Sequence, residues 1–135
     1  MIVRVPKKKL QYFRIKAKKS PVEVFAVLVG LRLSVNLLEV YEIKYPKIDK
    51  ATKDEVFVEF GAFSEIYTVA EADGYKVLGS IHSHLEWTNE LSEFDLKNHV
   101  KNEDIITGVC SVIGRKTFIN FWTRNSPLPC KIEYI

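Results

Sequence analysis

The sequence has little cysteine. Its only two cysteines, Cys110 and Cys130, lie far apart and do not form the CxxC pairs of a structural zinc site or a thiol redox motif. We expect both to be free thiols. A disulfide is the alternative, because the abundance of Lys, Glu, Ile and Val and the single glutamine, Gln11, are typical of thermophilic proteins, in which intracellular disulfides occur.

Long hydrophobic runs are also missing. No stretch approaches the roughly 20 apolar residues that cross a bilayer. The N-terminal MIVRVPKKKLQYF lacks the apolar core and the cleavage site of a secretory signal. The apolar and charged content is that of an ordinary globular protein, and the length suits one hydrophobic core. We therefore expect residues 1–135 to form a single cytoplasmic domain without contact with a membrane.

Acidic residues are absent from the first 22 positions. Eight cations occur there: Arg4, Lys7, Lys8, Lys9, Arg14, Lys16, Lys18 and Lys19. Since the whole chain has a net charge of +3, the remainder carries 3 − 8 = −5. Apolar Phe13, Ile15 and Ala17 alternate with basic residues, which favours a strand over 11–18 with a solvated basic face. Contact of this basic arm with an acidic partner or with nucleic acid is the alternative.

Helix and strand signals alternate along the rest of the chain. A helix start is indicated by Ser20 as the N-cap, Pro21 as the first helical residue and Glu23 as an acid in the first turn. These residues predict a helix over the apolar run that follows. Strands are expected at 37–45 and 55–60, with a polar connection at 46–53, and a short helix from Ser64 to Gly74.

The second half continues the alternation. A strand is expected at 75–84, then a loop at 85–91, a helix beginning at Ser92, a hairpin of 105–113 and 117–124 around a turn at 114–116, and a last strand at 131–135. Strands that alternate with helices and end in a hairpin indicate an α/β or α+β fold on one mixed sheet.

Two histidines end the strand expected at 75–84, in the stretch HSHLEWTNELSEFD. Residues two apart in a strand face the same way, so the rings of His82 and His84 are expected on one side. Asp95 falls in the first turn of the helix expected from Ser92. Two histidines and a carboxylate, with a fourth position left for water, are the donor set of a catalytic zinc site, whereas structural zinc sites use four protein ligands, usually with cysteine.

Each of these residues also has an ordinary structural explanation. Ser92 and Asp95 form a capping box, as do Ser20 and Glu23, and such boxes are common at helix starts. The joint pattern His-x-His-x(7)-Ser-x(2)-Asp favours a site, because four fixed identities at fixed offsets arise by chance in about one of a few thousand chains of this length.

This pattern resembles the signature of the JAMM (MPN+) zinc metalloproteases, which have a JAB domain. The upstream stretch PVEVFAVLVG is similar to the segment that carries the family's catalytic glutamate near the start of its first helix. The order of elements is similar over nearly the whole chain. The resemblance implies a mixed β-sheet flanked by helices, like that of cytidine deaminases.

The resemblance also implies an activity. By position, His82, His84 and Asp95 would hold one Zn²⁺ per chain, Glu23 would be the general base and Ser92 would stabilise the oxyanion. The reaction implied is hydrolysis of the peptide or isopeptide bond after the C-terminal Gly-Gly of ubiquitin-like or sulfur-carrier proteins.

The sequence departs from the family pattern at three places. Leu85 and Leu91 stand where family members often have proline. Glu23 is followed by Val24, Phe25 and Ala26, whereas the family's first helix frequently reads Glu-x-Cys-Gly. These departures remove no reacting group, and they indicate a divergent prokaryotic branch. A nucleotide deaminase is excluded, since it would need His-x-Glu and a later Cys-x-x-Cys. A non-catalytic scaffold of the same superfamily and a hydrolase linked to nucleic acid remain the alternatives.

Overall fold

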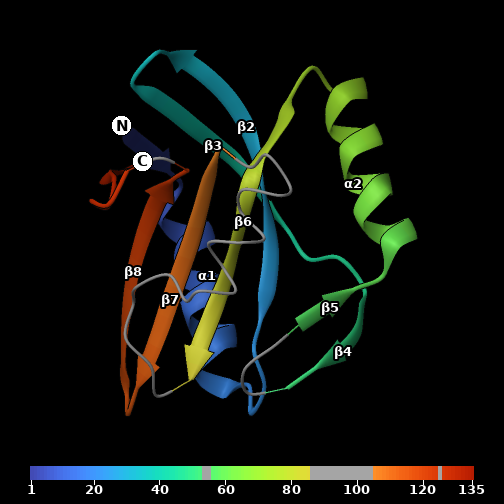
Figure 1. Ribbon diagram of the computed structural model, residues 1–135, viewed down its shortest axis with the longest axis vertical. Helices are drawn as coiled ribbons and strands as arrows, with labels where there is room; N and C mark the ends of the chain where they lie inside the picture. The colour runs from blue at the N-terminus through green and yellow to red at the C-terminus, as the bar shows by residue number, and fades with distance from the viewer. Residues whose placement is uncertain (53–55, 86–104, 125) are drawn as a thin grey trace.

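The chain folds around one mixed β-sheet. The structure, a computed structural model, describes residues 1–52, 56–85, 105–124 and 126–135. In this part of the chain seven strands form a sheet in the order β8-β7-β6-β2-β3-β1-β9 (Figure 1). Their bounds are β1 Ile2–Val5, β2 Phe25–Ser34, β3 Leu37–Lys44, β6 Lys76–Leu85, β7 Ile106–Ile113, β8 Lys116–Thr123 and β9 Lys131–Tyr134. β1 runs parallel to β3 and β9, and β6 runs parallel to β7. The other neighbours are antiparallel.

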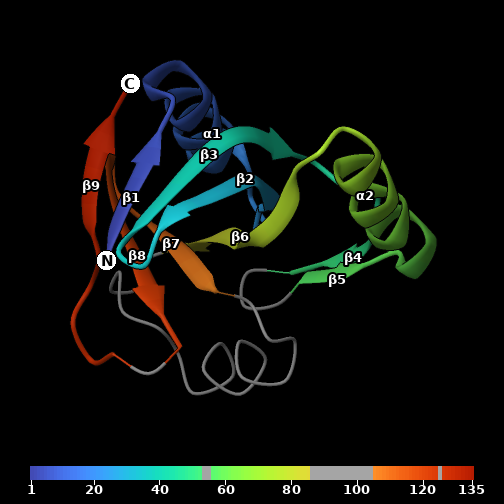
Figure 2. The same cartoon turned by 90° about the horizontal axis from the view of Figure 1, so that it is seen from above.

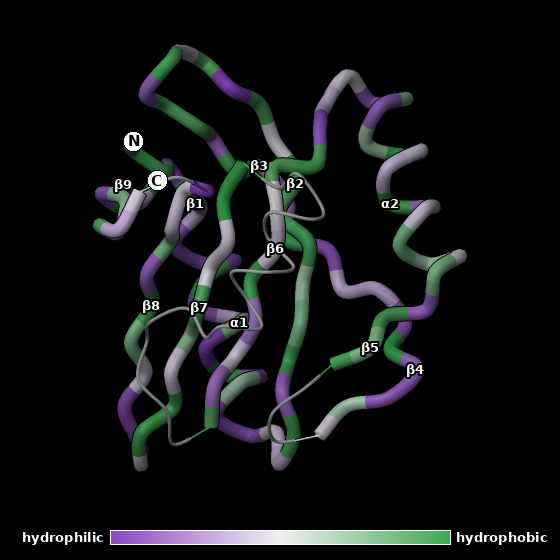
Figure 3. The backbone as a smooth tube through the Cα atoms, in the orientation of Figure 1, coloured by the Kyte–Doolittle hydropathy of each residue, from purple (hydrophilic) through white to green (hydrophobic). Residues whose placement is uncertain are grey.

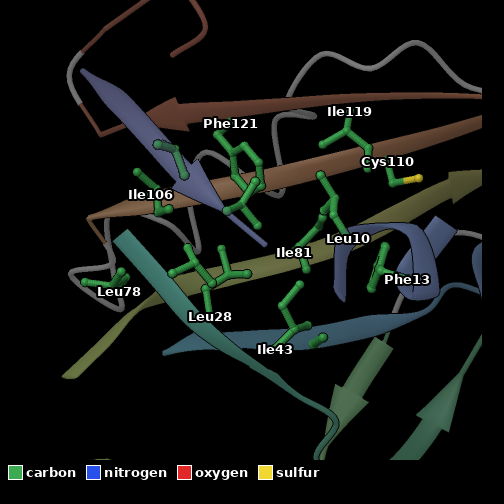
Figure 4. Close-up of a cluster of buried hydrophobic side chains, with 14 of the residues drawn as sticks. Leu10, Phe13, Leu28, Ile43, Leu78, Ile81, Ile106, Cys110, Ile119 and Phe121 are labelled. Atoms are coloured by element: carbon green, nitrogen blue, oxygen red, sulfur yellow. The ribbon is translucent and has the colours of Figure 1, made fainter. Parts of the chain in front are cut away.

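The two helices of the described residues cover opposite faces of this sheet (Figure 2). Helix α1, Lys7–Lys19, packs Leu10, Phe13 and Ala17 onto the larger buried core, which Figure 4 shows between the helix and the strands. Helix α2, Phe60–Ala72, lies against β2 on the other face, where Val27 and Val29 meet Ala70. A separate two-stranded sheet of β4, Ile48–Ala51, and β5, Val56–Val58, precedes α2.

This architecture confirms the expected mixed sheet flanked by helices. The strands expected at 37–45, 55–60, 75–84 and 131–135, the terminal hairpin and the helix near 64–74 are all present, with bounds shifted by a few residues. The hairpin turn contains Gly114 with a φ of 62°, a left-handed conformation that favours glycine. The loop expected at 85–91 and the helix expected from Ser92 lie outside the described residues, except that Leu85 still belongs to β6.

The strand expected at 11–18 is wrong, because these residues belong to helix α1. Leu10, Phe13 and Ala17 are spaced three and four apart, which is the helical period, and all three are buried. Ile15, which the strand pattern would bury beside Phe13, is 41% exposed. The basic residues lie on the remaining surface of a helix, and Lys16, Lys18 and Lys19 in its last turn favour the negative end of the helix dipole.

The helix expected from Ser20 is also wrong. Ser20 is the C-cap of α1, and its hydroxyl bonds the backbone of Val22 in a local turn. The apolar run that follows is strand β2, whose residues from Ala26 to Gly30 are all buried. Much of β2 has the green colour of hydrophobic residues in Figure 3. A strand covered on both faces has a continuous apolar run rather than an alternating one, so its pattern cannot be distinguished from that of a buried helix.

Several smaller features were not expected or were left open. β1 was missed, and β4 lies in the segment expected to be a polar connection. Cys110 and Cys130 are free thiols, as expected, and Cys110 lies in the core. In the described part of the chain, no helix is long and apolar enough to cross a membrane.

Candidate metal centre on strand β6

Strand β6 holds both predicted histidines in the middle of the sheet. Its residue His82 pairs with Phe25 of β2 on one side and with Val109 of β7 on the other. His84 pairs with Ser111 of β7. The two strands approach closely where Gly79 pairs with Ile106: a Cβ on Gly79 would lie 1.7 Å from the Ile106 carbonyl oxygen. Pairing on both sides fixes the backbone from which the two rings project.

The two imidazole rings converge. Nε2 of His82 lies 3.0 Å from Nε2 of His84, and the ring centroids are 4.8 Å apart. Both side chains are buried, with exposed fractions of 5% and 3%. At this distance one ring can donate a hydrogen bond to the other.

The same convergence fits a zinc ion. Two nitrogens that bind one tetrahedral zinc at about 2.0–2.1 Å lie about 3.3 Å apart. The observed Nε2 separation is only a few tenths of an ångström shorter. The donor atoms and their spacing therefore suit zinc with little rearrangement.

Glu23 lies in the turn that leads into β2, the strand that pairs with the histidine strand β6. The Ser83 amide donates to the Val24 carbonyl at 2.9 Å, and the Val24 amide donates to the Ser83 hydroxyl at 2.8 Å. These bonds join Val24 to Ser83 just beyond Phe25 and His82, the end pair of the β2–β6 register, and extending that register by two residues would put Glu23 opposite His84. Residues directly opposite one another in an antiparallel pair share a face. Glu23 is 6% exposed, and its amide donates to the Thr52 carbonyl at 2.7 Å.

The structure therefore brings three of the five predicted residues to one end of β6. Ser92 and Asp95, the other two, lie outside the described residues. Within the ranges that are described, no group of three or more His, Cys, Asp or Glu side chains could hold a metal ion. The predicted ligand set requires Asp95, and the roles of all five residues stay predictions.

Two serines beside the histidines were missed from the sequence. Ser83 anchors Val24, next to Glu23, through its hydroxyl. Ser111 is fully buried beside His84, and its hydroxyl has no hydrogen-bond partner in the described part of the chain. A signal for Ser111 was present, since a serine inside the otherwise apolar run at 109–113 is unusual for a strand with both faces covered.

Comparison with solved structures identifies the fold. The solution structure of protein DSY2949 from Desulfitobacterium hafniense matches 98% of this chain and 92% of that chain, with a TM-score of 0.71 and 15% identity. The crystal structure of AF2198, a JAB1/MPN domain protein from Archaeoglobus fulgidus, matches 98% of this chain and 97% of that chain, with a TM-score of 0.65 and 18% identity. No protein-family model matches the sequence, and no curated protein sequence does. The fold that the sequence predicts is confirmed, and the chain has the fold of a JAB1/MPN domain.

Proposed function

We propose that this protein is a zinc-dependent peptidase or isopeptidase that hydrolyses the bond after the C-terminal Gly-Gly of a ubiquitin-like or sulfur-carrier protein. The observation that carries the proposal is the 3.0 Å approach of the two buried Nε2 atoms on β6. The substrate class comes from the resemblance of the His-x-His-x(7)-Ser-x(2)-Asp pattern to JAMM metalloproteases, and the JAB1/MPN fold agrees with that resemblance.

His82, His84 and Asp95 would hold the zinc ion in this proposal. Zinc supplies Lewis acidity and lowers the pKa of water to about 7. Glu23, which is buried near the start of β2, would accept the proton of the attacking water and return it to the departing amine. The Ser92 hydroxyl would donate to the carbonyl oxygen as negative charge develops on it, and one such donor contributes about 3 kcal/mol to transition-state stabilisation.

The test is zinc content by mass spectrometry together with cleavage of a ubiquitin-like protein fused through its terminal diglycine. We expect one zinc per chain in the wild type and loss of both zinc and cleavage in His84→Ala. Glu23→Gln is the matched variant: because Glu23 acts on the proton rather than on the metal, it should keep zinc and lose cleavage.

One outcome would refute the proposal, and another would refute only the role of Glu23. A wild-type protein that stays free of metal after zinc is supplied would favour the non-catalytic scaffold. A protein that binds zinc, yet whose Glu23→Gln variant cleaves as fast as the wild type, would show that Glu23 is not the base.

The surface of α1 supports a second role, contact with nucleic acid. The helix carries seven Lys and Arg residues and no acidic residue. Lys9 pairs with Glu42, and Lys16 lies over the rings of Tyr12 and Tyr45, but in the described ranges Lys8 and Lys18 are exposed and form no ion pair. This surface lies on the face of the sheet opposite α2 (Figure 2).

Salt dependence tests this role. Binding of a single-stranded oligonucleotide should weaken with salt, and Lys8→Gln with Lys18→Gln should reduce the slope of log K against log salt by about 0.7 for each phosphate that the variant no longer neutralises. Equal slopes for wild type and variant would refute the contact, and binding only to acidic proteins would assign the surface to an acidic partner.

A further inference from the structure

A buried hydroxyl beside the histidine pair has no partner. Ser111 of β7 is 0% exposed, and its Oγ makes no hydrogen bond within the described part of the chain. It lies in register with His84 in the parallel β6–β7 pair. Cys110 and Val112, its neighbours along β7, belong to the core under α1, so Ser111 points to the other face, the one that also carries His82 and His84.

A buried hydroxyl without a hydrogen bond lowers the stability of the folded protein. Buried side-chain polar atoms without a partner are few in native proteins. An alanine or valine side chain would occupy the same position on the strand without that cost. A role that appears only when the site is filled is a physical reason for a hydroxyl here.

A metal ion bound by the histidine pair fixes where the two ring protons lie. At 3.0 Å, a hydrogen bond between the two Nε2 atoms requires one ring to carry its proton on Nε2. Metal coordination needs both Nε2 atoms bare, so each neutral ring carries its proton on Nδ1 when the metal is bound. Histidines that bind metal almost always donate the remaining N–H to an acceptor, which fixes the tautomer and the ring orientation.

The side chains on β7 beside the two rings differ in their ability to accept a hydrogen bond. Val109, in register with His82, has no acceptor atom in its side chain, whereas Ser111, in register with His84, has a hydroxyl oxygen with both lone pairs available. Directly paired residues on neighbouring strands lie close enough for a serine hydroxyl to reach an imidazole edge.

We propose that Ser111 is a positioning residue, whose hydroxyl accepts the Nδ1–H of His84 when both Nε2 atoms bind a metal ion. This inference rests on the proposed zinc site and goes beyond it by assigning a hydrogen-bonding residue outside the predicted signature. Ser111 touches neither substrate nor metal, and its effect passes through the orientation of His84.

The experiment measures the affinity of the protein for zinc by competition with a chelator, and the visible absorption of the Co²⁺-substituted protein. Ser111→Ala should bind zinc 10- to 100-fold more weakly, as is typical when a ligand is deprived of its hydrogen-bond partner, and should change the Co²⁺ spectrum. Ser111→Thr keeps the hydroxyl and should restore most of the affinity. Thr107→Val is the matched control, since Thr107 is a buried hydroxyl on the same face of β7 that pairs with Ser80 rather than with a histidine.

Thermal unfolding without metal separates a positioning role from a structural one. Ser111→Ala should leave the metal-free protein as stable as the wild type or slightly more stable, because the hydroxyl has no partner to lose. Wild-type zinc affinity in Ser111→Ala would overturn the inference and leave the proposed function standing. A wild type that binds no zinc would overturn both.

Discussion

Leu10 and Ile15 lie on different sides of helix α1, one in the core and the other on the surface. Leu10 is 1% exposed in the core under α1, whereas Ile15 is 41% exposed. Leu10→Ala should cost about 2–5 kcal/mol, the range for removing a buried leucine side chain. Ile15→Ala should change the free energy of unfolding by less than about 0.5 kcal/mol, since the side chain is on the surface and alanine has the higher helix propensity.

The assay is thermal unfolding followed by circular dichroism. With an unfolding entropy of about 2.1 cal/mol/K per residue, this chain has about 0.28 kcal/mol/K, so Leu10→Ala should lower Tm by roughly 7–18 °C. Ile15→Ala should shift Tm by less than about 2 °C on the same scale. In a strand over 11–18, Ile15 would share the buried face with Phe13 and Leu10 would lie before the strand. A larger loss in Ile15→Ala than in Leu10→Ala would therefore refute the helical placement.

Two further predictions concern the sheet that carries the site. Gly79→Ala should destabilise the fold and weaken zinc binding, because the new Cβ would lie 1.7 Å from the Ile106 carbonyl oxygen. Gly61→Ala in α2, where the nearest atom to the new Cβ is 3.6 Å away, should stabilise the fold by up to about 1 kcal/mol. Urea titration measures the unfolding free energy of both variants, and equal changes in the two would contradict the close approach of β6 and β7. Burial raises the pKa of the Cys110 thiol from 9.0 to about 11. As the pH rises, the thiol therefore loses its proton at a lower pH in the unfolded chain than in the folded one. The free energy of unfolding should fall between pH 9 and 11, by roughly 2–3 kcal/mol at most. Cys110→Ala removes this contribution, and an alkaline loss of stability as large in the variant as in the wild type would exclude it.

The histidine pair could be predicted because it depends on one strand only. Side chains alternate along any strand, so a two-residue spacing places His82 and His84 on one face whatever the neighbouring strands are. Ser111 could not be predicted in the same way. Its place beside His84 depends on the parallel register of β6 and β7, two strands that lie far apart in the sequence.

Glu23 illustrates how a residue can be proposed for a site through a wrong local structure. Its capping box with Ser20 predicted a helix start, yet the segment is a turn that enters β2. The link between Glu23 and the histidines comes instead from the β2–β6 register and from the Ser83 hydroxyl. Both are contacts between distant segments, which no local pattern contains.

The sequence by itself determined the features that depend on neighbours along the chain: the strands bounded by turn signals, the hairpin at Gly114, and the spacing of the two histidines. The tertiary structure alone decided that residues 7–19 form a helix and residues 25–34 a strand. Both patterns are locally ambiguous, and the choice follows from burial: β2 has sheet partners on both sides and both faces covered, while α1 buries one stripe and leaves its lysines in solvent. The same assembly places Glu23 and Ser111 beside the histidines, because strand register is fixed by packing across the whole sheet.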